Sequence, residues 1–254
     1  MKNIIFNNKI IKVYDSIDEM PIINFQKYNK YLLIDSGIGS DADDIDAHIV
    51  RIAKFIKANN TAKALQELQN MRQNIHMVNS KISPKYMAFA ALIHSIDGRQ
   101  VTDLSDENLK SILEQLKNVK HSKIIDFLVW LKKKVAFELE TYFPNDFITP
   151  KEKEAYDRLK QRTLLVLDTI ISETDNSEQI DMIDTMMLNM QSPKSFTGSE
   201  SVEVKYDKQF ESTCLLISQK TNIDAKKMTV LQFYNAVENI KHQMEAEAKS
   251  VKRN

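Results

Sequence analysis

Residues 61–84 of the chain, TAKALQELQNMRQNIHMVNSKISP, decide its fold class. The apolar side chains in this stretch recur at alternating spacings of four and three residues, which places them on one face of an α-helix. Ser83-Pro84 then supplies a cap followed by a proline, which predicts that another helix starts directly afterwards. The heptad spacing suits helix–helix packing, either inside the chain or against a partner. The positions on this face are Ala64, Leu68, Met71, Ile75, Val78 and Ile82.

Helical spacing continues on both sides of this stretch, so that about nine helices are expected in all. The apolar segment from Tyr86 to Ile96 is expected to be helical up to Asp97-Gly98, where a glycine would cap its end. A later helix, expected after Thr149, carries its own stripe at Tyr156, Leu159, Thr163, Val166 and Ile170.

The first residues have a different pattern. Ile4–Phe6 and Ile10–Tyr14 are two short β-prone runs that flank Asn7-Asn8-Lys9. Asparagine tolerates positive φ, so this arrangement predicts a β-hairpin. The expected fold class is therefore mainly α, a multi-helix bundle with a short N-terminal β-hairpin.

The composition supports the same class. The 254 residues include only 4 glycines and 5 prolines, where an average chain would carry roughly 18 and 13. That is too little glycine for a phosphate-binding loop, a dinucleotide-binding fingerprint or a turn-rich β-sandwich. A chain with so few tight turns is expected to consist of capped helices.

One stretch is expected to divide the chain. Residues 191–205 contain Pro193, Gly198 and many serine, threonine and glutamate side chains, which predicts a linker or mobile loop. It would separate a helical core with the hairpin, residues 1–190, from a C-terminal helical part, residues 206–254. A single domain with a long loop is the alternative.

The charge balance bears on possible partners. Lysine and arginine number 35, as do aspartate and glutamate, so that the net charge is zero. A nucleic-acid partner is therefore not expected, because such binders usually carry a basic excess. Residues 117–134, with Lys132–Lys134 beside Trp130, leave a nucleic-acid-associated regulatory protein as an alternative. Zero net charge also removes the self-repulsion that opposes association.

The sequence lacks the signals of an enzyme. It has no catalytic motif, and its five histidines show no spacing of a helical metal pair. The acidic cluster from Asp41 to His48 is interpreted as a helix N-terminus rather than a metal site, because carboxylates are favourable there. Cys214 lies in an apolar context and is expected to be a buried thiol. We therefore expect no enzymatic activity, cofactor or metal. No apolar stretch reaches the ~18–20 residues needed to span a membrane, so no membrane partner is expected.

Two stretches resemble a known group of proteins. They are DSIDEMPIINFQKYNKYLLIDSGIGS, residues 15–40, and IDAKKMTVLQFYN, residues 223–235. Together they resemble helical virion or virion-assembly proteins of tailed bacteriophages, most nearly the crAss-like phages of gut Bacteroides. The second stretch is also similar to C-terminal helices of phage tail-assembly chaperones. The resemblance implies a multi-copy, non-enzymatic protein that works by contact with other phage structural proteins.

The expected function follows from this resemblance: a structural or assembly component of a phage particle, in the portal–neck–tail region and located in the virion. The chain would form a homo-oligomer such as a ring. The alternative is a tail-assembly chaperone that is not retained in the virion. The residues expected to contact partners are Ile4, Phe6, Ile11 and Val13 in the hairpin, and Val230, Phe233, Val237 and Ile240 in the last helix.

Overall fold

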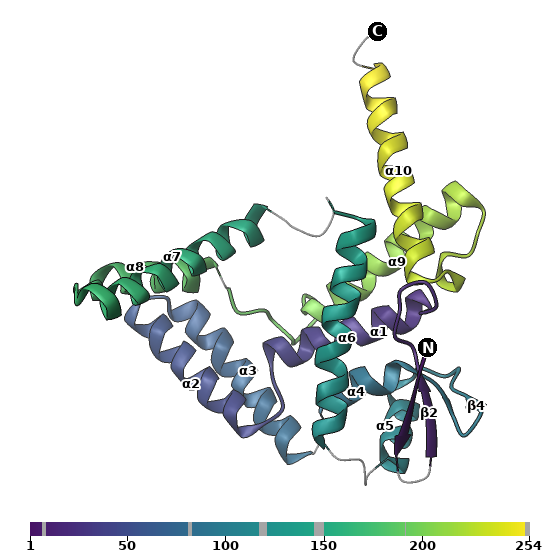
Figure 1. The fold of residues 1–254 in the computed structure, drawn as a ribbon, viewed down its shortest axis with the longest axis horizontal. Coiled ribbons are helices and arrows are strands. Elements are labelled where there is room, and N and C mark those ends of the chain that lie inside the picture. The colour runs from purple at the N-terminus through teal and green to yellow at the C-terminus, as the bar shows by residue number, and fades with distance from the viewer. Residues whose placement is uncertain (7–8, 81–82, 117–120, 145–149, 191, 252–254) are drawn as a thin grey trace. The chain divides into compact units, whose positions relative to one another are not determined.

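The computed structural model describes residues 1–6, 9–80, 83–116, 121–144, 150–190 and 192–251. Within these residues it contains ten α-helices and a small four-stranded sheet (Figure 1). The predicted fold class, mainly helical with an N-terminal β-hairpin, is confirmed. The elements are β1 (Lys2–Phe6), β2 (Lys9–Val13), α1 (Ile22–Gly37), α2 (Ala42–Lys57), α3 (Thr61–Asn79), α4 (Pro84–Ala91), β3 (Ile93–Ile96), β4 (Arg99–Gln100), α5 (Asp106–Gln115), α6 (His121–Tyr142), α7 (Pro150–Ser172), α8 (Ser177–Met190), α9 (Val202–Thr221), the 3-10 helix η1 (Ala225–Lys227) and α10 (Val230–Val251).

The sheet is antiparallel, with its strands in the order β1-β2-β3-β4. In the predicted N-terminal hairpin, Ile4 lies opposite Ile11. A second hairpin joins β3 to β4 through Asp97-Gly98, whose φ angles are 49° and 81°. Two successive positive φ angles are what a tight two-residue hairpin turn requires. In this strand order, β1 lies at one edge of the sheet and β4 at the other.

The expected helix from Tyr86 to Ile96 is correct only in its first half. Helix α4 ends at Ala91, and the next residues form β3. The side chains from Met87 to Ile93 are all buried, and a continuous apolar run does not distinguish a buried helix from a buried strand. Asp97-Gly98, interpreted as a helix end, is the turn of a hairpin.

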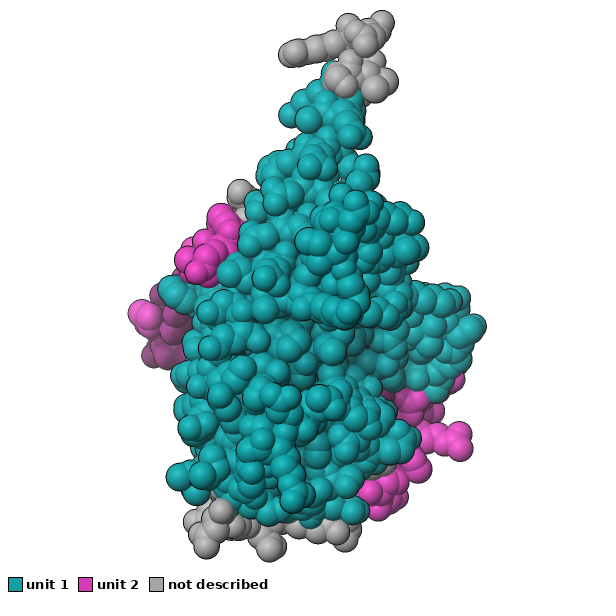
Figure 2. Space-filling view, turned by 90° about the vertical axis from the view of Figure 1, so that its right-hand side faces the viewer, with its two compact units in different colours: residues 1–36, 83–139, 196–254 teal, residues 37–82, 140–195 magenta. Residues whose placement is uncertain are grey.

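The chain forms two compact units, which Figure 2 distinguishes by colour. Unit 1 comprises residues 1–36, 83–139 and 196–254, and unit 2 comprises residues 37–82 and 140–195. These units differ from the division expected at 191–205, since residues 206–254 belong with the N-terminal hairpin. Helix α9 also begins at Val202, inside the expected linker.

Unit 1 has its core around α4. Phe89 of this helix is fully buried and meets Phe127 of α6 edge to face, with ring centroids 5.8 Å apart. Ile11 and Val13 of the hairpin are also fully buried. Burial of such side chains is the main favourable contribution to folding, about 1.5–3 kcal/mol for each.

The start of α1 and the start of α10 lie side by side in unit 1. The backbone N–H of Ile22 donates to the carbonyl of Met228, and that of Val230 donates to the carbonyl of Met20, both at 2.9 Å. Next to these bonds, Phe25 and Tyr234 pack edge to face at 6.4 Å. These two hydrogen bonds therefore hold the first residues of α1 and of α10 next to each other.

Unit 2 is built from two helical hairpins, α2 with α3 and α7 with α8 (Figure 1). A capping box starts α2: the Asp41 carboxylate accepts from the Asp44 N–H at 3.0 Å, and Asp44 accepts from the Asp41 N–H at 3.1 Å. Arg162 of α7 forms a two-bond ion pair with Asp184 of α8, at 2.6 and 3.1 Å. This pair fixes the face that α7 turns toward α8.

The buried face of α3 is polar, unlike the apolar face expected from its heptad spacing. Ala64 is buried, but Leu68 and Ile75 are 46% and 40% exposed. The buried positions also include Glu67, Asn70 and Asn74, which bind groups outside the helix. These polar partners, supplied by distant parts of the chain, decide which face of α3 points inward.

Candidate functional site

The predicted contact residues of the hairpin lie mostly in the interior. Ile11 and Val13 have no exposed surface, and Ile4 is partly buried. The side chain of Phe6 lies outside the described residues. What the hairpin exposes instead is one of its faces, where Ile5 of β1 is 68% exposed and its cross-strand partner Ile10 of β2 is 53% exposed. A partner could meet this strand only through its edge and its exposed face.

The predicted contact residues of the last helix are also packed within unit 1. Val230 is fully buried, Phe233 and Ile240 are 5% exposed, and Val237 is partly buried. Phe233 stacks on Phe210 of α9 with ring centroids 5.9 Å apart. These four side chains therefore hold α10 against its own chain.

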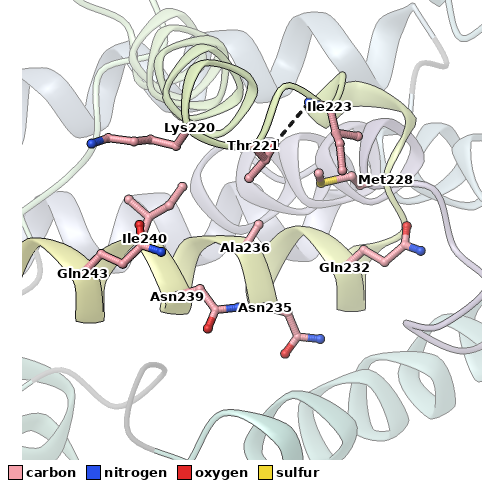
Figure 3. A pocket seen from close by; sticks show the side chains of 10 residues that line it. All are labelled: Lys220, Thr221, Ile223, Met228, Gln232, Asn235, Ala236, Asn239, Ile240 and Gln243. Atoms are coloured by element: carbon pink, nitrogen blue, oxygen red, sulfur yellow. Dashed lines mark hydrogen bonds between the residues drawn. The ribbon is translucent and has the colours of Figure 1, made fainter.

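Beyond Ile240, α10 leaves the body of unit 1. Every residue from 241 to 249 is exposed, and Figure 1 shows the helix continuing past its neighbours. At the point of departure, a groove of about 560 Å³ lies between α10 and the end of α9. Figure 3 shows four amide side chains of α10 along it, together with Lys220, Ile223 and Met228; these amides are Gln232, Asn235, Asn239 and Gln243.

The basic residues of α6 are divided between solvent and ion pairs. Lys132 and Lys133 are exposed, whereas Lys134 pairs with Asp15 at 3.2 Å. Burial would raise the pKa of the Asp15 carboxyl, but the N-terminal ammonium and Lys134 outweigh it and lower that pKa. Trp130 lies beneath two cations, since the ammonium groups of Lys2 and Lys134 are 4.1 and 5.4 Å from its ring. Residues 117–120, which belong to the predicted nucleic-acid face, lie outside the described residues.

The acidic cluster before α2 acts as the predicted helix cap, through Asp41 and Asp44. The neighbouring His48 is 1% exposed; its Nδ1 lies 2.7 Å from Glu67 Oε1 and its Nε2 lies 2.8 Å from the carbonyl of Ile38. Arg51 also donates to Glu67. This cluster joins α2 to α3. Among the described residues, no group of three histidine, cysteine, aspartate or glutamate side chains could hold a metal ion.

Helix α7 has the longest exposed apolar face. Tyr156 is 69% exposed, Ile170 70% and Ile171 78%, and Leu159, Leu164 and Leu167 lie between 46% and 57%. Successive residues differ by about 100° around a helix, so these six side chains fall within about 140°. Together they form a stripe on one side of α7, hereafter the α7 stripe, which consists of Tyr156, Leu159, Leu164, Leu167, Ile170 and Ile171.

The opposite side of α7 is the one that packs inside unit 2. There Arg162 pairs with Asp184. Asp168 lies on the flank between the two sides, about 110° from the centre of the stripe, and accepts from Asn176 at 2.9 Å where the chain turns into α8. The more polar side of the helix thus faces its own chain, and its apolar side faces outward. Further exposed apolar residues of unit 2 are Ile49, Val50, Ile56, Leu65, Leu68, Ile75, Tyr142 and Met182.

The sequence contained a signal for this surface. The stripe predicted from helical spacing consists of Tyr156, Leu159, Thr163, Val166 and Ile170. Tyr156, Leu159 and Ile170 belong to the α7 stripe, whereas Val166 is partly buried. Spacing alone does not say whether such a stripe is covered by the same chain. Only the pairing of α7 with α8 through Arg162 decides that question.

Comparisons with known proteins give no relative. No family model matches the chain, and neither a curated protein sequence nor a solved structure matches it. Among the described helices, none combines the length and the apolar character needed to cross a bilayer. The candidate site therefore rests on the surface geometry.

Proposed function

We propose that this protein is a non-enzymatic, multi-copy subunit that acts through protein–protein contacts as a structural or assembly component of a tailed phage particle, in its portal–neck–tail region and located in the virion. The phage context rests on the resemblance of residues 15–40 and 223–235. Action through contact rests on the surface of the chain.

The observation that carries the proposal is the α7 stripe. Soluble monomers rarely expose contiguous apolar patches of more than a few hundred Å², and larger ones mark sites of interaction. Six large apolar side chains on one side of a single helix exceed what scattered surface residues explain. A surface of this kind gains free energy when a partner removes it from water.

The edge of the sheet is a second place where another chain could add. Strand β1 is paired only on the side of β2, and its outer edge ends the sheet. Unpaired edge groups can accept a strand from a neighbouring subunit. Multi-copy assemblies use such repeated contacts to set the geometry between copies.

Mass spectrometry of purified particles and of assembly intermediates tests the proposal. A virion component is expected in mature particles at a fixed ratio to the other structural proteins. A tail-assembly chaperone is expected in intermediates and absent from the mature particle. Absence from both, together with a strictly monomeric purified protein, would contradict the proposed function.

A further inference from the structure

We propose that the α7 stripe is a self-association surface, on which α7 of a second copy of this chain packs antiparallel about a two-fold axis. This inference rests on the proposed function, because it names the partner for the exposed surface of unit 2. Three features of α7 support a second copy as the occupant: the length of the stripe, its area and its charges.

The stripe has the length and area that a two-fold contact needs. It runs from Tyr156 to Ile171, about 22 Å at 1.5 Å per residue. Each of its side chains exposes on the order of 100 Å², so a copy contributes roughly 600–700 Å², close to the ~800 Å² per partner of a standard interface. Two copies therefore cover one another with little of the stripe left in solvent.

The charges of α7 favour the antiparallel orientation. From Tyr156 to Thr163 the helix carries three cations, Arg158, Lys160 and Arg162, against one carboxylate, Asp157, whereas the charged residues from 164 to 175 are all acidic: Asp168, Glu173 and Asp175. A parallel pair would bring the two acidic halves together. An antiparallel pair opposes them to the more basic halves, and it also opposes the helix dipoles.

One ion pair follows from the geometry of the two-fold axis. With the centre of the contact between Thr163 and Leu164, Lys160 of one copy is level with Asp168 of the other to within about one residue. Around the helix, Lys160 lies about 30° and Asp168 about 110° from the centre of the stripe, both on the same flank. A two-fold axis brings matching flanks together, so that the long Lys160 side chain extends toward Asp168 at the margin of the contact. The pair forms twice, while Leu164 meets Leu164 of the second copy at the axis.

Sedimentation velocity of the full chain gives the first test, with Leu164→Glu against Ile56→Glu as the matched control. Ile56 is 61% exposed on α2 of the same unit, and Leu164 is 57% exposed. We expect Leu164→Glu to weaken self-association by at least about tenfold, since it places two carboxylates at the axis. Ile56→Glu should leave it unchanged. Circular dichroism verifies that both variants remain folded.

The charge arrangement gives an independent test. Lys160→Glu puts like charges opposite each other and is expected to weaken association, and Asp168→Asn in that background is expected to restore part of it. Asn176 and Ser172 donate to different oxygens of Asp168. The asparagine keeps one acceptor oxygen for Asn176, and its amide NH₂ can donate to the Ser172 hydroxyl, which also accepts hydrogen bonds. A loss without any recovery would contradict the predicted pair.

Cross-linking tests the orientation. The chain has one cysteine, Cys214, so Cys214→Ser gives a background free of thiols. Leu164→Cys is expected to form a disulfide between copies under mild oxidation. A mixture of Tyr156→Cys and Ile171→Cys is expected to give mixed dimers; dimers of each variant with itself would indicate a parallel pair and overturn the inference.

The outcomes separate this inference from the proposed function. An oligomer that Leu164→Glu does not affect contradicts the α7 contact but leaves other surfaces for assembly. A monomer that is nevertheless found in particles assigns the stripe to a different protein or to another part of the same chain. A monomer absent from particles and intermediates contradicts both proposals.

Discussion

Glu67 is a buried carboxylate whose partners come from the neighbouring helix. It lies between His48 and Arg51 of α2 and is 3% exposed. Burial alone would raise the pKa of this carboxyl, but the hydrogen bonds from His48 and Arg51 outweigh burial and hold the pKa below its usual value. The charged form is therefore the one that the folded protein stabilises.

We predict that Glu67→Gln lowers the free energy of unfolding at pH 7 by about 2 kcal/mol, because it removes the negative charge that pairs with Arg51 and weakens the hydrogen bonds to this side chain. The folded pKa lies below the unfolded value of about 4.3, so the carboxylate stabilises the fold above that pH. This contribution disappears as the pH falls through the folded pKa. Urea unfolding across that range should show the two proteins converging at acid pH, with exposed Glu140→Gln as the control. A gap that does not shrink would contradict the prediction.

Gly39 is the residue that allows the capping box of α2 to form. Its φ is +74°, and an added Cβ would lie 2.2–2.5 Å from the side chain of Asp44, the residue that closes the box. Gly98 also has a positive φ, +81°, but a Cβ there would meet nothing within 4 Å. An alanine at either position would therefore have a strained positive φ, but only an alanine at position 39 would also collide with Asp44.

We predict that Gly39→Ala destabilises the protein by about 1–2 kcal/mol more than Gly98→Ala. Both variants incur the strain of a positive φ, and only the first also displaces Asp44 from the cap. Thermal unfolding of the two variants under the same buffer measures the difference. Equal losses would mean that Asp44 can move at no cost.

At the scale of elements, α10 shows that apolar residues at helical spacing need not be exposed to solvent. Its predicted contact residues Val230, Phe233 and Ile240 are buried against unit 1, while Met244, further along the same helix, is 53% exposed. The sequence places all of them at heptad spacing. The apolar residues of α10 that lie beside α9 are buried or partly buried, and those beyond the end of α9 are exposed to solvent.

We predict that Phe233→Ala lowers the free energy of unfolding by about 3–5 kcal/mol, as expected for a buried aromatic ring. Met244→Ala should change stability by less than about 0.5 kcal/mol. Denaturant unfolding provides both values. If Phe233→Ala instead weakened association and left stability unchanged, the residue would act as the partner contact that its spacing first indicated.

The elements also show how far the sequence predicts this fold. Helices with capping residues and a regular apolar period were predictable, as was the pairing of the two N-terminal strands. The strand after α4 was not, because a fully buried run has no period to read. The polar buried face of α3 was not predictable either, since Asn74 and Asn70 bind the carbonyls of Ile38 and Lys194, which are far away in sequence.

The candidate site was predictable only in part, for the same reason. The apolar spacing of Tyr156, Leu159 and Ile170 is visible in the sequence, but their exposure is not. It depends on Arg162 and Asp184, whose ion pair turns the other side of α7 toward α8. Long-range polar contacts therefore decide which of several similar stripes becomes a surface.

For the whole molecule, a two-fold contact has a consequence for assembly. An isologous contact closes with two copies, so the α7 stripe alone gives a dimer and no ring. A ring needs a second contact surface in addition to the stripe, for which the outer edge of β1 is available. Variants of the stripe and of the edge strand should therefore fail at different stages of assembly.

The zero net charge of the chain gives the last prediction, which concerns salt. Apolar burial does not weaken as ionic strength rises, whereas phosphate binding by lysines and arginines falls steeply. We therefore expect self-association to change less than about threefold between roughly 0.05 and 0.5 M NaCl, with a small loss from the screened Lys160–Asp168 pairs. Sedimentation velocity measures the dimer, and filter binding with duplex DNA over the same range provides the comparison.

A dimer that dissociates with a steep salt slope would mean that charges, not the α7 stripe, hold the copies together. Tight, salt-sensitive DNA binding would instead favour a role for the exposed lysines of α6.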